Sequence, residues 1–333
     1  AVIEAKAATQ KSEEVRRQAI LYAEALEHKY GVRPVIYYTN GFKTNVIDGL
    51  GYMDRPVYAF HSMDDLERLI QKRGRARISN LSINENITNR PYQQTAIKSI
   101  VEWLNQQHRR GLLVLATGTG KTRVSISLCD ILMRNDWVKN VLFLADRTAL
   151  VNQAHKNYEA FLPNVTMTVL SEEKEPNMKA RIMFSTYQTM INYIDKEDKK
   201  FTIGKFDLII IDEAHRSVFG RYGAIFNYFD SLLIGLTATP RDEIDRSTYD
   251  LLQLDNGTPN YSYDYEEAVA DEYLVPYKTL QYHSKIMETG IKWDDLPKEQ
   301  QDKLEEVWTY EKALAGMSDD EEYHRDIESK EIF

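Results

Sequence analysis

A glycine-rich loop between an apolar strand and a helix is the feature of this sequence that most restricts its fold. The loop is ATGTGKT, residues 116–122, and it follows the apolar run GLLVLA, residues 111–116. A helical pattern of apolar residues begins directly after the loop, at 124–132. A strand, a loop of this kind and a helix together form a phosphate-binding unit at the edge of a parallel sheet. The sequence therefore predicts an α/β fold with a nucleotide at this edge.

The residues of the loop have the properties that a nucleoside triphosphate with Mg²⁺ requires. Gly118 and Gly120 allow the backbone to wrap around anionic oxygens, to which backbone N–H groups donate. Lys121 is expected to reach the β and γ phosphates, and the Thr122 hydroxyl is expected to bind Mg²⁺. The general pattern has one more glycine, at the position that Leu115 occupies here. The predicted ATP-binding residues of the loop are Thr117, Gly118, Thr119, Gly120, Lys121 and Thr122.

A strand that ends in two carboxylates supplies the second half of the predicted site. The sequence FDLIIIDEAH, residues 206–215, places Asp212 and Glu213 directly after an apolar run. Asp212 is expected to hold Mg²⁺ beside the loop, and Glu213 is expected to orient the attacking water as a base. His215 is expected to face the groups across the cleft.

Helical and strand patterns alternate from Pro91 to about Lys278. Several strands are apolar throughout, as expected for strands that helices cover on both faces. The alternation predicts a parallel α/β sheet covered by helices. Strands are predicted at 112–116, 141–145, 165–170, 182–185, 208–211 and 233–236, and helices at 96–104, 124–132 and 150–161.

The first 70 or so residues follow a different order, of strand, helix, hairpin and helix. Residues 1–5 form an apolar strand, and 12–30 has its apolar side chains on one helical face. Strands at 34–39 and 42–47 flank Asn40-Gly41, the pair that most readily takes the two positive φ angles of a tight hairpin. Two antiparallel strands are therefore predicted.

Charge is distributed unevenly along the chain. Residues 281–333 hold 15 acidic and 7 basic side chains, so this tail carries −8 of the net charge of −9. Because the rest is close to neutral, a phosphate-binding surface requires local clusters of Lys and Arg. One such run, KRGRAR at 72–77, begins a polar linker; we expect its charges to be solvated, with contact to DNA as the alternative.

Cysteine content and hydropathy restrict the class of protein. The single Cys129 excludes an internal disulfide, and no apolar run approaches the roughly 20 residues that a membrane span needs. No pattern at the N-terminus is typical of a signal peptide. The sequence predicts a cytoplasmic protein with no membrane partner.

Several motifs together resemble those of superfamily 2 helicases and translocases. ATGTGKT, DEAH and Thr-Ala-Thr-Pro at 237–240 are similar to motifs I, II and III of that superfamily. RPYQ at 90–93 resembles its adenine-reading element, LADRTALVNQA at 144–154 its motif Ia, and STYQT at 185–189 its motif Ib. The resemblance implies a RecA-like lobe.

The same resemblance implies roles for further residues. Gln93 is expected to bond the adenine edge, with Arg90 or Tyr92 beside the ring. Motif III, with Thr237 and Thr239, is expected to couple hydrolysis to the grip on nucleic acid, together with His215. The implied contacts to the DNA backbone are Arg147, Thr186 and Gln188.

Two pairs of polar residues near the N-terminus suggest metal chemistry. Glu4 and Lys6 lie two apart on a strand and share a face, so Glu4 can bind a divalent metal while Lys6 positions the water. Gln18 and Tyr22 lie four apart and share a helical face. Strand EAK, helix QAILY and then the motor motifs resemble the restriction subunit of type I restriction enzymes, as does YSYDYEEAVADEYLVPYK at 261–278. In that family a PD-(D/E)xK nuclease with a QxxxY element precedes the translocase.

This resemblance implies an ATP-dependent translocase and endonuclease of double-stranded DNA. Its cofactors are ATP and Mg²⁺, and its partners are DNA and the modification (methyltransferase) and specificity subunits. We expect a partial PD-(D/E)xK domain at 1–73, a linker at 74–90, the first RecA-like lobe at 91–278 and an acidic, mostly helical connector at 279–333. The family's metal-binding Asp and its second lobe lie outside this chain, so the chain alone should not cut DNA and should hydrolyse ATP poorly.

Two alternatives remain open. One is a superfamily 2 DNA helicase of repair or transcription with an unrelated N-terminal domain. The other is a nucleotide-dependent switch or scaffold that binds ATP and a partner without translocating. A mixed sheet with Glu4, Lys6, Gln18 and Tyr22 on one cleft favours the restriction enzyme, whereas ATPase activity indifferent to duplex DNA favours the switch.

Overall fold

The computed structural model describes most of the first 277 residues. The chain divides into a compact unit, Ala1–Val275, and a second unit, Pro276–Phe333. The predicted connector at 279–333 lies outside the described residues, apart from Lys298. No helix among the described residues is long and apolar enough to cross a membrane. The described residues are 1–7, 12–79, 81–170, 175–195, 199–214, 216–239, 244, 246–255, 257–277 and 298.

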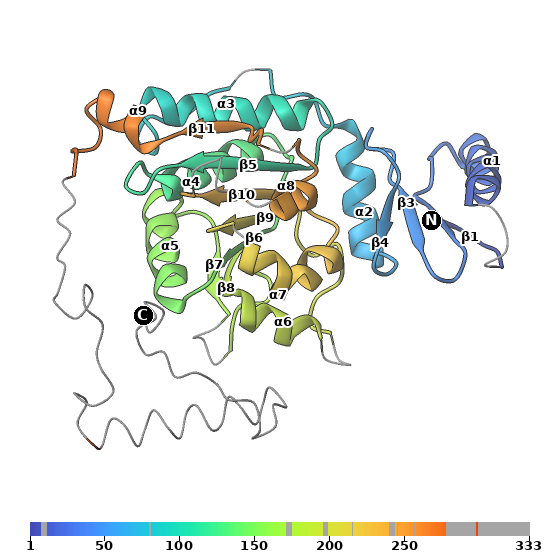
Figure 1. Ribbon diagram of the computed structural model, residues 1–333. Helices are drawn as coiled ribbons and strands as arrows, with labels where there is room; N and C mark the ends of the chain where they lie inside the picture. The colour runs from blue at the N-terminus through green and yellow to red at the C-terminus, as the bar shows by residue number, and fades with distance from the viewer. Residues whose placement is uncertain are drawn as a thin grey trace. The chain divides into compact units, whose positions relative to one another are not determined.

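The N-terminal residues form a four-stranded mixed sheet between two helices (Figure 1). The strands lie in the order β1-β2-β3-β4, with β1 parallel to β2 and the other pairs antiparallel. Apolar side chains of α1 pack on one face of the sheet, and Leu66 and Leu69 of α2 pack on the other. The elements are β1 (Val2–Ala5), α1 (Ser12–Tyr30), β2 (Ile36–Thr39), β3 (Thr44–Ile47), β4 (Arg55–Val57), α2 (Met63–Gln71) and the 3₁₀ helix η1 (Lys72–Gly74).

The predicted hairpin forms, but its turn is longer than predicted. Thr39 pairs with Thr44, so four residues connect the strands instead of two. Gly41 has a φ of 89°, whereas Asn40 does not have a positive φ. The Asn40 side chain accepts hydrogen bonds from the backbone N–H groups of Phe42 and Lys43, at 3.2 and 3.0 Å. Asn40 therefore stabilises the turn through its side chain and not through a left-handed backbone.

Residues 110–263 contain a seven-stranded sheet, in the order β11-β5-β10-β9-β6-β8-β7, and every pair in it is parallel. Buried side chains of α3, α4 and α5 cover one face, and those of α6, α7 and α8 cover the other (Figure 1). The strands are β5 (Arg110–Leu115), β6 (Val141–Ala145), β7 (Met167–Val169), β8 (Ile182–Thr186), β9 (Leu208–Asp212), β10 (Leu232–Thr237) and β11 (Tyr261–Tyr263). The helices are α3 (Pro91–Asn105), α4 (Lys121–Arg134), α5 (Thr148–Phe161), α6 (Tyr187–Ile194), α7 (Arg216–Tyr228), α8 (Arg246–Leu252) and α9 (Tyr265–Ala270).

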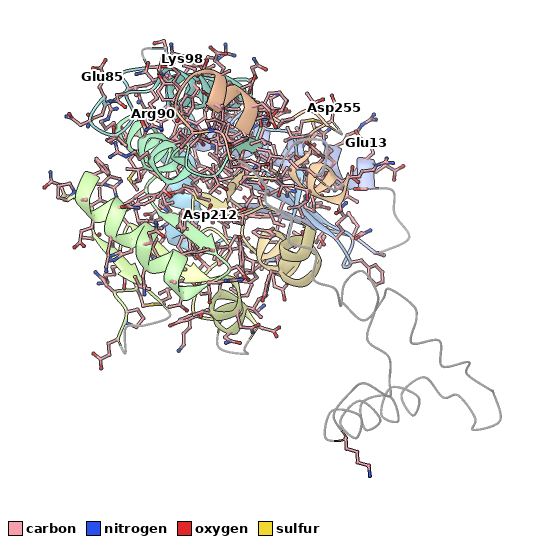
Figure 2. All side chains as sticks on the ribbon, turned by 60° about the vertical axis from the view of Figure 1, so that its left-hand side comes forward. Glu13, Glu85, Arg90, Lys98, Asp212 and Asp255 are labelled. Carbon is pink, nitrogen blue, oxygen red and sulfur yellow. The ribbon has the colours of Figure 1, made fainter. Side chains whose placement is uncertain are left out.

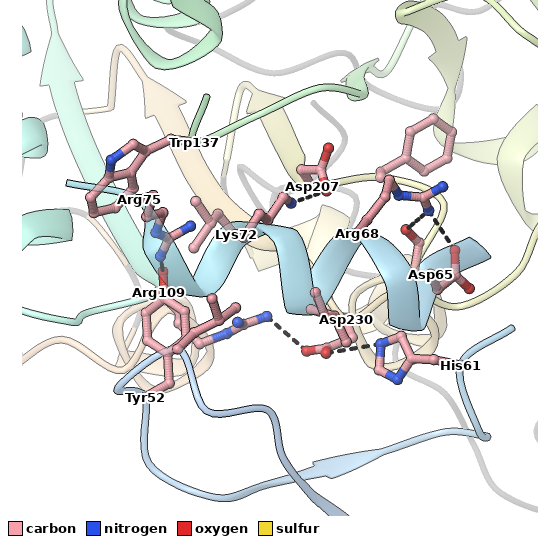
Figure 3. A pocket seen from close by; sticks show the side chains of 15 residues that line it. Tyr52, His61, Asp65, Arg68, Lys72, Arg75, Arg109, Trp137, Asp207 and Asp230 are labelled. Carbon is pink, nitrogen blue, oxygen red and sulfur yellow. Dashed lines mark hydrogen bonds and ion pairs between the residues drawn. The ribbon is translucent and has the colours of Figure 1, made fainter. Parts of the chain in front are cut away.

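The basic run at 72–77 packs against the lobe, so the prediction that its charges are solvated is wrong for several of them (Figure 3). Lys72 pairs with the buried carboxylate of Asp207. The guanidinium of Arg75 lies over the Trp137 ring, 3.9 Å from the centroid. The next residues also pack on the lobe, since the indole N–H of Trp137 donates to the carbonyl of Ala76.

A buried group of charges, here called the Asp230 cluster, joins the N-terminal sheet to the lobe (Figure 3). Its members are Asp230, Arg109 and His61, which Figure 3 labels, and Arg55 of β4, which is not drawn there. Asp230 accepts from Arg55 and Arg109 at 2.6 and 2.7 Å, and His61 Nε2 lies 3.2 Å from the same carboxylate. Burial opposes ionisation of Asp230, but Arg109 and Arg55 hold its pKa well below the usual range. The buried carboxylate of Asp230 is therefore ionised and paired with both guanidinium groups.

Candidate nucleotide-binding site

The phosphate loop has the backbone that its two glycines predict. Gly118 and Gly120 have φ angles of 88° and 92°, in the left-handed region that side chains disfavour. Gly120 caps the N-terminus of α4, where backbone N–H groups and the helix dipole favour an anion. A Cβ atom at Gly120 would lie 2.6 Å from Nε2 of Gln93, so the close approach of Gln93 also requires glycine.

The adenine-reading element predicted at 90–93 lies directly against the loop. The Tyr92 hydroxyl and the Gln93 side-chain amide both donate to the carbonyl of Thr119, at 2.7 and 2.8 Å. The Thr119 hydroxyl donates to the Ala116 carbonyl at 2.6 Å. Arg90 donates to the Tyr92 hydroxyl at 2.9 Å. These bonds fix the shape of the loop from the side of α3.

The acidic pair at the end of β9 meets the loop across one intervening strand. β10 lies between β5 and β9, and its residues Thr237 and Leu236 pair with Val114 and Asp212. Lys121 Nζ lies 3.2 Å from Oε1 of Glu213. The sequence separation of loop and acids is large, but parallel strands bring their carboxyl ends to one edge.

The acidic pair combines an unusual backbone angle at Glu213 with a raised pKa at Asp212. Glu213 has a φ of 54°, in the left-handed region that non-glycine residues adopt uncommonly. Burial, and then the negative charge of Glu213, raise the pKa of Asp212 to about 6, while Lys121 lowers it. The hydroxyl of Tyr187 donates to the Asp212 carbonyl at 2.9 Å and helps to fix the strand end.

The donors at this edge fit Mg²⁺. Two neighbouring carboxylates, one of them largely buried, hold negative charge that a divalent cation offsets. Among the described residues, no group of three or more His, Cys, Asp or Glu side chains is arranged to hold a metal ion. Mg²⁺ usually keeps several waters and binds one or two carboxylates together with substrate phosphates, so Asp212 and the Thr122 hydroxyl fit this ion beside a triphosphate.

The predicted coupling residues lie at the same edge, as far as the structure describes them. Thr237 is fully buried at the end of β10, and its hydroxyl accepts from the N–H of Thr239 at 3.1 Å. His215 lies outside the described residues, so its expected position facing the cleft stays a prediction.

The residues predicted to contact DNA come from two neighbouring strand ends. Ala145 of β6 pairs with Thr186 of β8, so Arg147 and Gln188 follow at the same edge of the sheet. The side chain of Arg147 is 81 % exposed, and Gln188 is exposed. Thr186 is buried, and its hydroxyl caps α6 by accepting from the N–H of Thr189 at 3.2 Å.

The four N-terminal candidates form two separate pairs. Lys6 Nζ lies 3.1 Å from a Glu4 carboxylate oxygen, and the Gln18 amide donates to the Tyr22 hydroxyl at 2.9 Å. Glu4 pairs with Tyr38, which faces α1, so both pairs lie on the same side of the sheet. Within the part of the chain that the structure describes, no hydrogen bond or ion pair links one pair to the other.

Asp54, whose carboxylate lies near these residues, was not among the predicted site residues. Asp54 accepts from the Tyr38 hydroxyl at 2.5 Å and from Arg16 at 2.9 Å. The hydrogen bond from Tyr38 lowers the pKa of Asp54 most, and Arg16 lowers it further. No local sequence pattern marks Asp54, because its partners come from β2 and α1.

A parallel sheet with a phosphate loop after β5, an acidic pair after β9 and Thr-Ala-Thr after β10 defines the nucleotide-binding lobe of superfamily 2 helicase-like proteins. Residues 86–242 match the family described as the res subunit of type III restriction enzymes. The chain is a helicase-like relative of type I restriction enzyme subunits.

Parts of individual proteins are similar to this chain. The chain is 36 % identical over 197 residues to the endonuclease subunit of the type I restriction enzyme EcoAI from Escherichia coli, covering 57 % of this chain and 24 % of that protein. It is 29 % identical over 211 residues to the EcoKI endonuclease subunit of strain K12, covering 56 % and 17 %. The chain thus spans a quarter or less of these relatives. A fragment described as an HsdR subunit of a type I restriction enzyme from Vibrio vulnificus YJ016 aligns with a TM-score of 0.41 at 26 % identity, over 81 % of this chain and 48 % of that one.

Proposed function

We propose that this chain is the ATP-binding motor region of a type I restriction enzyme, in the subunit that translocates and cleaves double-stranded DNA. One observation carries the proposal: Lys121 of the phosphate loop lies 3.2 Å from Glu213 of the acidic pair. In this proposal the loop binds the triphosphate, Asp212 and Thr122 hold Mg²⁺, and Glu213 orients the attacking water. When bound, Mg²⁺ offsets the charge that develops on the phosphates.

Further residues complete the proposed cycle. Gln93 reads the adenine edge, and Thr237 and Thr239, with His215, couple hydrolysis to the grip on DNA. Arg147, Thr186 and Gln188 contact the DNA backbone. Arg147 and Gln188 are exposed at one edge of the sheet, which supports this role.

The domain assignment is part of the same proposal. Residues 1–73 are assigned to a PD-(D/E)xK nuclease domain, 74–90 to a linker, 91–278 to the first RecA-like lobe and 279–333 to a connector. Glu4, Lys6, Gln18 and Tyr22 are assigned to the nuclease site, with Glu4 as metal ligand. The mixed sheet, and the position of both pairs on the side of it that α1 covers, support this assignment. The proposed partners are the methyltransferase and specificity subunits.

Nucleotide binding and hydrolysis test the proposed site. Calorimetric titration with ATP and Mg²⁺ should show binding that Lys121→Ala abolishes. Glu213→Gln should keep the binding and lose the slow hydrolysis, because the carboxylate acts on the water and not on the phosphates. Lys98→Ala, an exposed lysine of α3 labelled in Figure 2, is the matched control and should behave as the wild type. Equal binding by the wild type and Lys121→Ala would refute the proposal.

DNA binding separates a motor from a nucleotide-dependent switch. Arg147 and Arg246 both have side chains that are 81 % exposed, but only Arg147 lies at the predicted DNA edge. Arg147→Ala should weaken binding to duplex DNA and reduce the salt dependence of log K by about one unit, because one phosphate contact is lost. Arg246→Ala should leave both unchanged. If the wild type, Arg147→Ala and Arg246→Ala bind duplex DNA identically, the result would favour a nucleotide-dependent switch.

A further inference from the structure

A segment downstream of the nucleotide-binding motifs folds back onto the phosphate loop. β11 pairs with β5 in a register that matches Tyr263 with Leu115, the last residue of β5. The N–H of Ala116 then donates to the Tyr263 carbonyl at 3.0 Å, where the loop begins. α9 follows, and its Ala268 is fully buried in the core of the lobe. The segment is therefore part of the fixed frame of the site.

A tight turn after α9 returns the chain to the loop. Glu272 has a φ of 62°, and the N–H groups of Tyr273 and Leu274 both donate to the Ala268 carbonyl, at 2.9 and 3.0 Å. Leu274 lies so close to the loop that a Cβ atom on Gly118 would be 3.2 Å from its side chain. Tyr273, the residue before Leu274, is consequently held close to the phosphate loop.

Tyr92, one of the two residues predicted to lie beside the adenine ring, has little open surface. It is 5 % exposed, and its ring stacks on Tyr263 with a centroid distance of 4.0 Å and an interplanar angle of 10°. Its hydroxyl is bonded to the Thr119 carbonyl. Tyr92 therefore supports the loop and offers no free face to a base.

Tyr273 has the exposure that Tyr92 lacks. It is 36 % exposed and meets the edge of Tyr92 at 5.1 Å between ring centroids. The guanidinium of Arg90 lies 5.1 Å from the centroid of the Tyr273 ring. An aromatic ring and a guanidinium plane are the two groups that stack best on a nucleobase. Tyr273 directly precedes Leu274, and Arg90 lies two residues before Tyr92; Leu274 and Tyr92 both lie against the phosphate loop.

We propose that Tyr273 stacks on the nucleobase of bound ATP, beside Arg90. The inference rests on the proposed ATP site and adds a base-binding residue from the stretch at 261–278, to which no role at that site was assigned. Loss of an aromatic stack weakens nucleotide binding by about 10-fold. Stacking involves only the base, so a ligand made of phosphates alone is indifferent to Tyr273.

Two ligands separate stacking from support of the fold. ATP and inorganic tripolyphosphate, each with Mg²⁺, are titrated into the wild type, Tyr273→Ala, Tyr273→Phe and Tyr30→Ala. Tyr30 is an exposed tyrosine at the end of α1 and serves as the matched control. We expect Tyr273→Ala to bind ATP about 10-fold more weakly and tripolyphosphate as the wild type does. Tyr273→Phe and Tyr30→Ala should bind both ligands normally.

The other outcomes overturn the inference in distinguishable ways. Unchanged ATP affinity in Tyr273→Ala means that the ring does not touch the base. An equal loss for ATP and tripolyphosphate means that Tyr273 only supports the loop. If the wild type binds neither ligand, the proposed nucleotide site itself is wrong, and the role of Tyr273 falls with it.

Discussion

At the scale of single residues, Gly120 and Gln93 depend on each other. Gly120 is in the left-handed region at 92°, and Gln93 occupies the space that a side chain at 120 would need. Gln93 is 2 % exposed and bonded to the Thr119 carbonyl, so it has no room to retreat without breaking that bond. Any side chain at position 120 therefore displaces the loop or Gln93, the residue proposed to read the base.

Gly120→Ala should lower ATP affinity by about 10-fold or more, because the loop must leave its phosphate-binding shape. Gly41→Ala is the matched control, since Gly41 has a φ of 89° and nothing within 4 Å of a new Cβ atom. The control should lose about 1 kcal/mol of stability and keep its ATP affinity. Calorimetric titration and urea unfolding measure both quantities. Equal ATP affinities in the two variants would contradict the argument.

The raised pKa of Asp212 predicts how the thermal stability of the chain depends on pH. Its pKa is raised from 3.8 to about 6 by burial and by Glu213. Between pH 3.8 and about 6 this carboxyl group is protonated in the folded chain and ionised in the unfolded chain. The free energy of unfolding therefore falls as the pH rises through this range, and the ionised carboxylate destabilises the fold above pH 6. Asp212→Asn should therefore raise the melting temperature at pH 8 by about 3 to 6 °C in metal-free buffer. This gain in melting temperature should shrink as the pH falls through 6, because the Asp212 carboxylate of the wild type then becomes protonated and neutral.

Thermal unfolding followed from pH 5 to pH 8 checks this expectation. Asp250→Asn, at an exposed carboxylate of α8, is the control and should show no comparable gain. A gain of the same size at pH 5 and pH 8 would mean that packing, and not charge, makes Asp212 unfavourable.

At the scale of elements, the Asp230 cluster connects β4, β5 and the turn between α7 and β10. The Asp230 side chain is 6 % exposed, and its partners Arg55 and Arg109 are 14 % and 16 % exposed. Asp230→Asn leaves two buried guanidinium groups with less counter-charge, which costs about 3 kcal/mol. For a unit of this size the melting temperature should fall by roughly 6 to 12 °C.

Asp130→Asn is the matched control for the cluster. Asp130 pairs with Arg134 of the next turn of α4 at 2.9 Å, and the Arg134 side chain is 45 % exposed; such pairs within a helix contribute about 0.5 kcal/mol or less. The free energies of unfolding of the two variants, measured by chemical denaturation, should therefore differ by about 2 kcal/mol or more. Equal losses would show that Asp230 does not hold the N-terminal sheet to the lobe.

Elements with a clear apolar pattern were predicted from the sequence, whereas β4, β11 and the helices α6 and α7 were not. The helix predicted at 12–30 and the strand predicted at 141–145 match α1 and β6 residue for residue. β4 and β11 have three residues each, too few for a periodicity, and β4 has Pro56 in its centre. They form because β3 and β5 offer pairing edges, which a sequence pattern does not show.

Contacts between distant residues explain the remaining differences. Lys72 and Asp207 lie 135 positions apart, so no local pattern marks the basic run at 72–77 as buried. By contrast, the loop and the acidic pair could be predicted, because each is a local motif at the end of a strand. Tyr187 and Tyr273 were not assigned to the site, since only the folded sheet brings them to it.

At the scale of the whole molecule, Cys129 reports on unfolding. It is the only cysteine of the chain, lies in α4 and is fully buried in the core, and burial raises the pKa of its thiol to about 12. A neutral, enclosed thiol does not react with iodoacetamide, so labelling should require unfolding of the lobe.

ATP with Mg²⁺ should slow the labelling of Cys129, because a ligand that binds only the folded state lowers the unfolded population. At a ligand concentration 100 times the Kd, stabilisation is about 2.7 kcal/mol, which corresponds to roughly a 100-fold slower reaction when refolding is fast. Lys121→Ala should label at the same rate with and without ATP. Mass spectrometry of timed samples gives both rates. Rapid labelling of the native wild type would show that the core around α4 opens without unfolding, and ATP would then have no protective effect to measure.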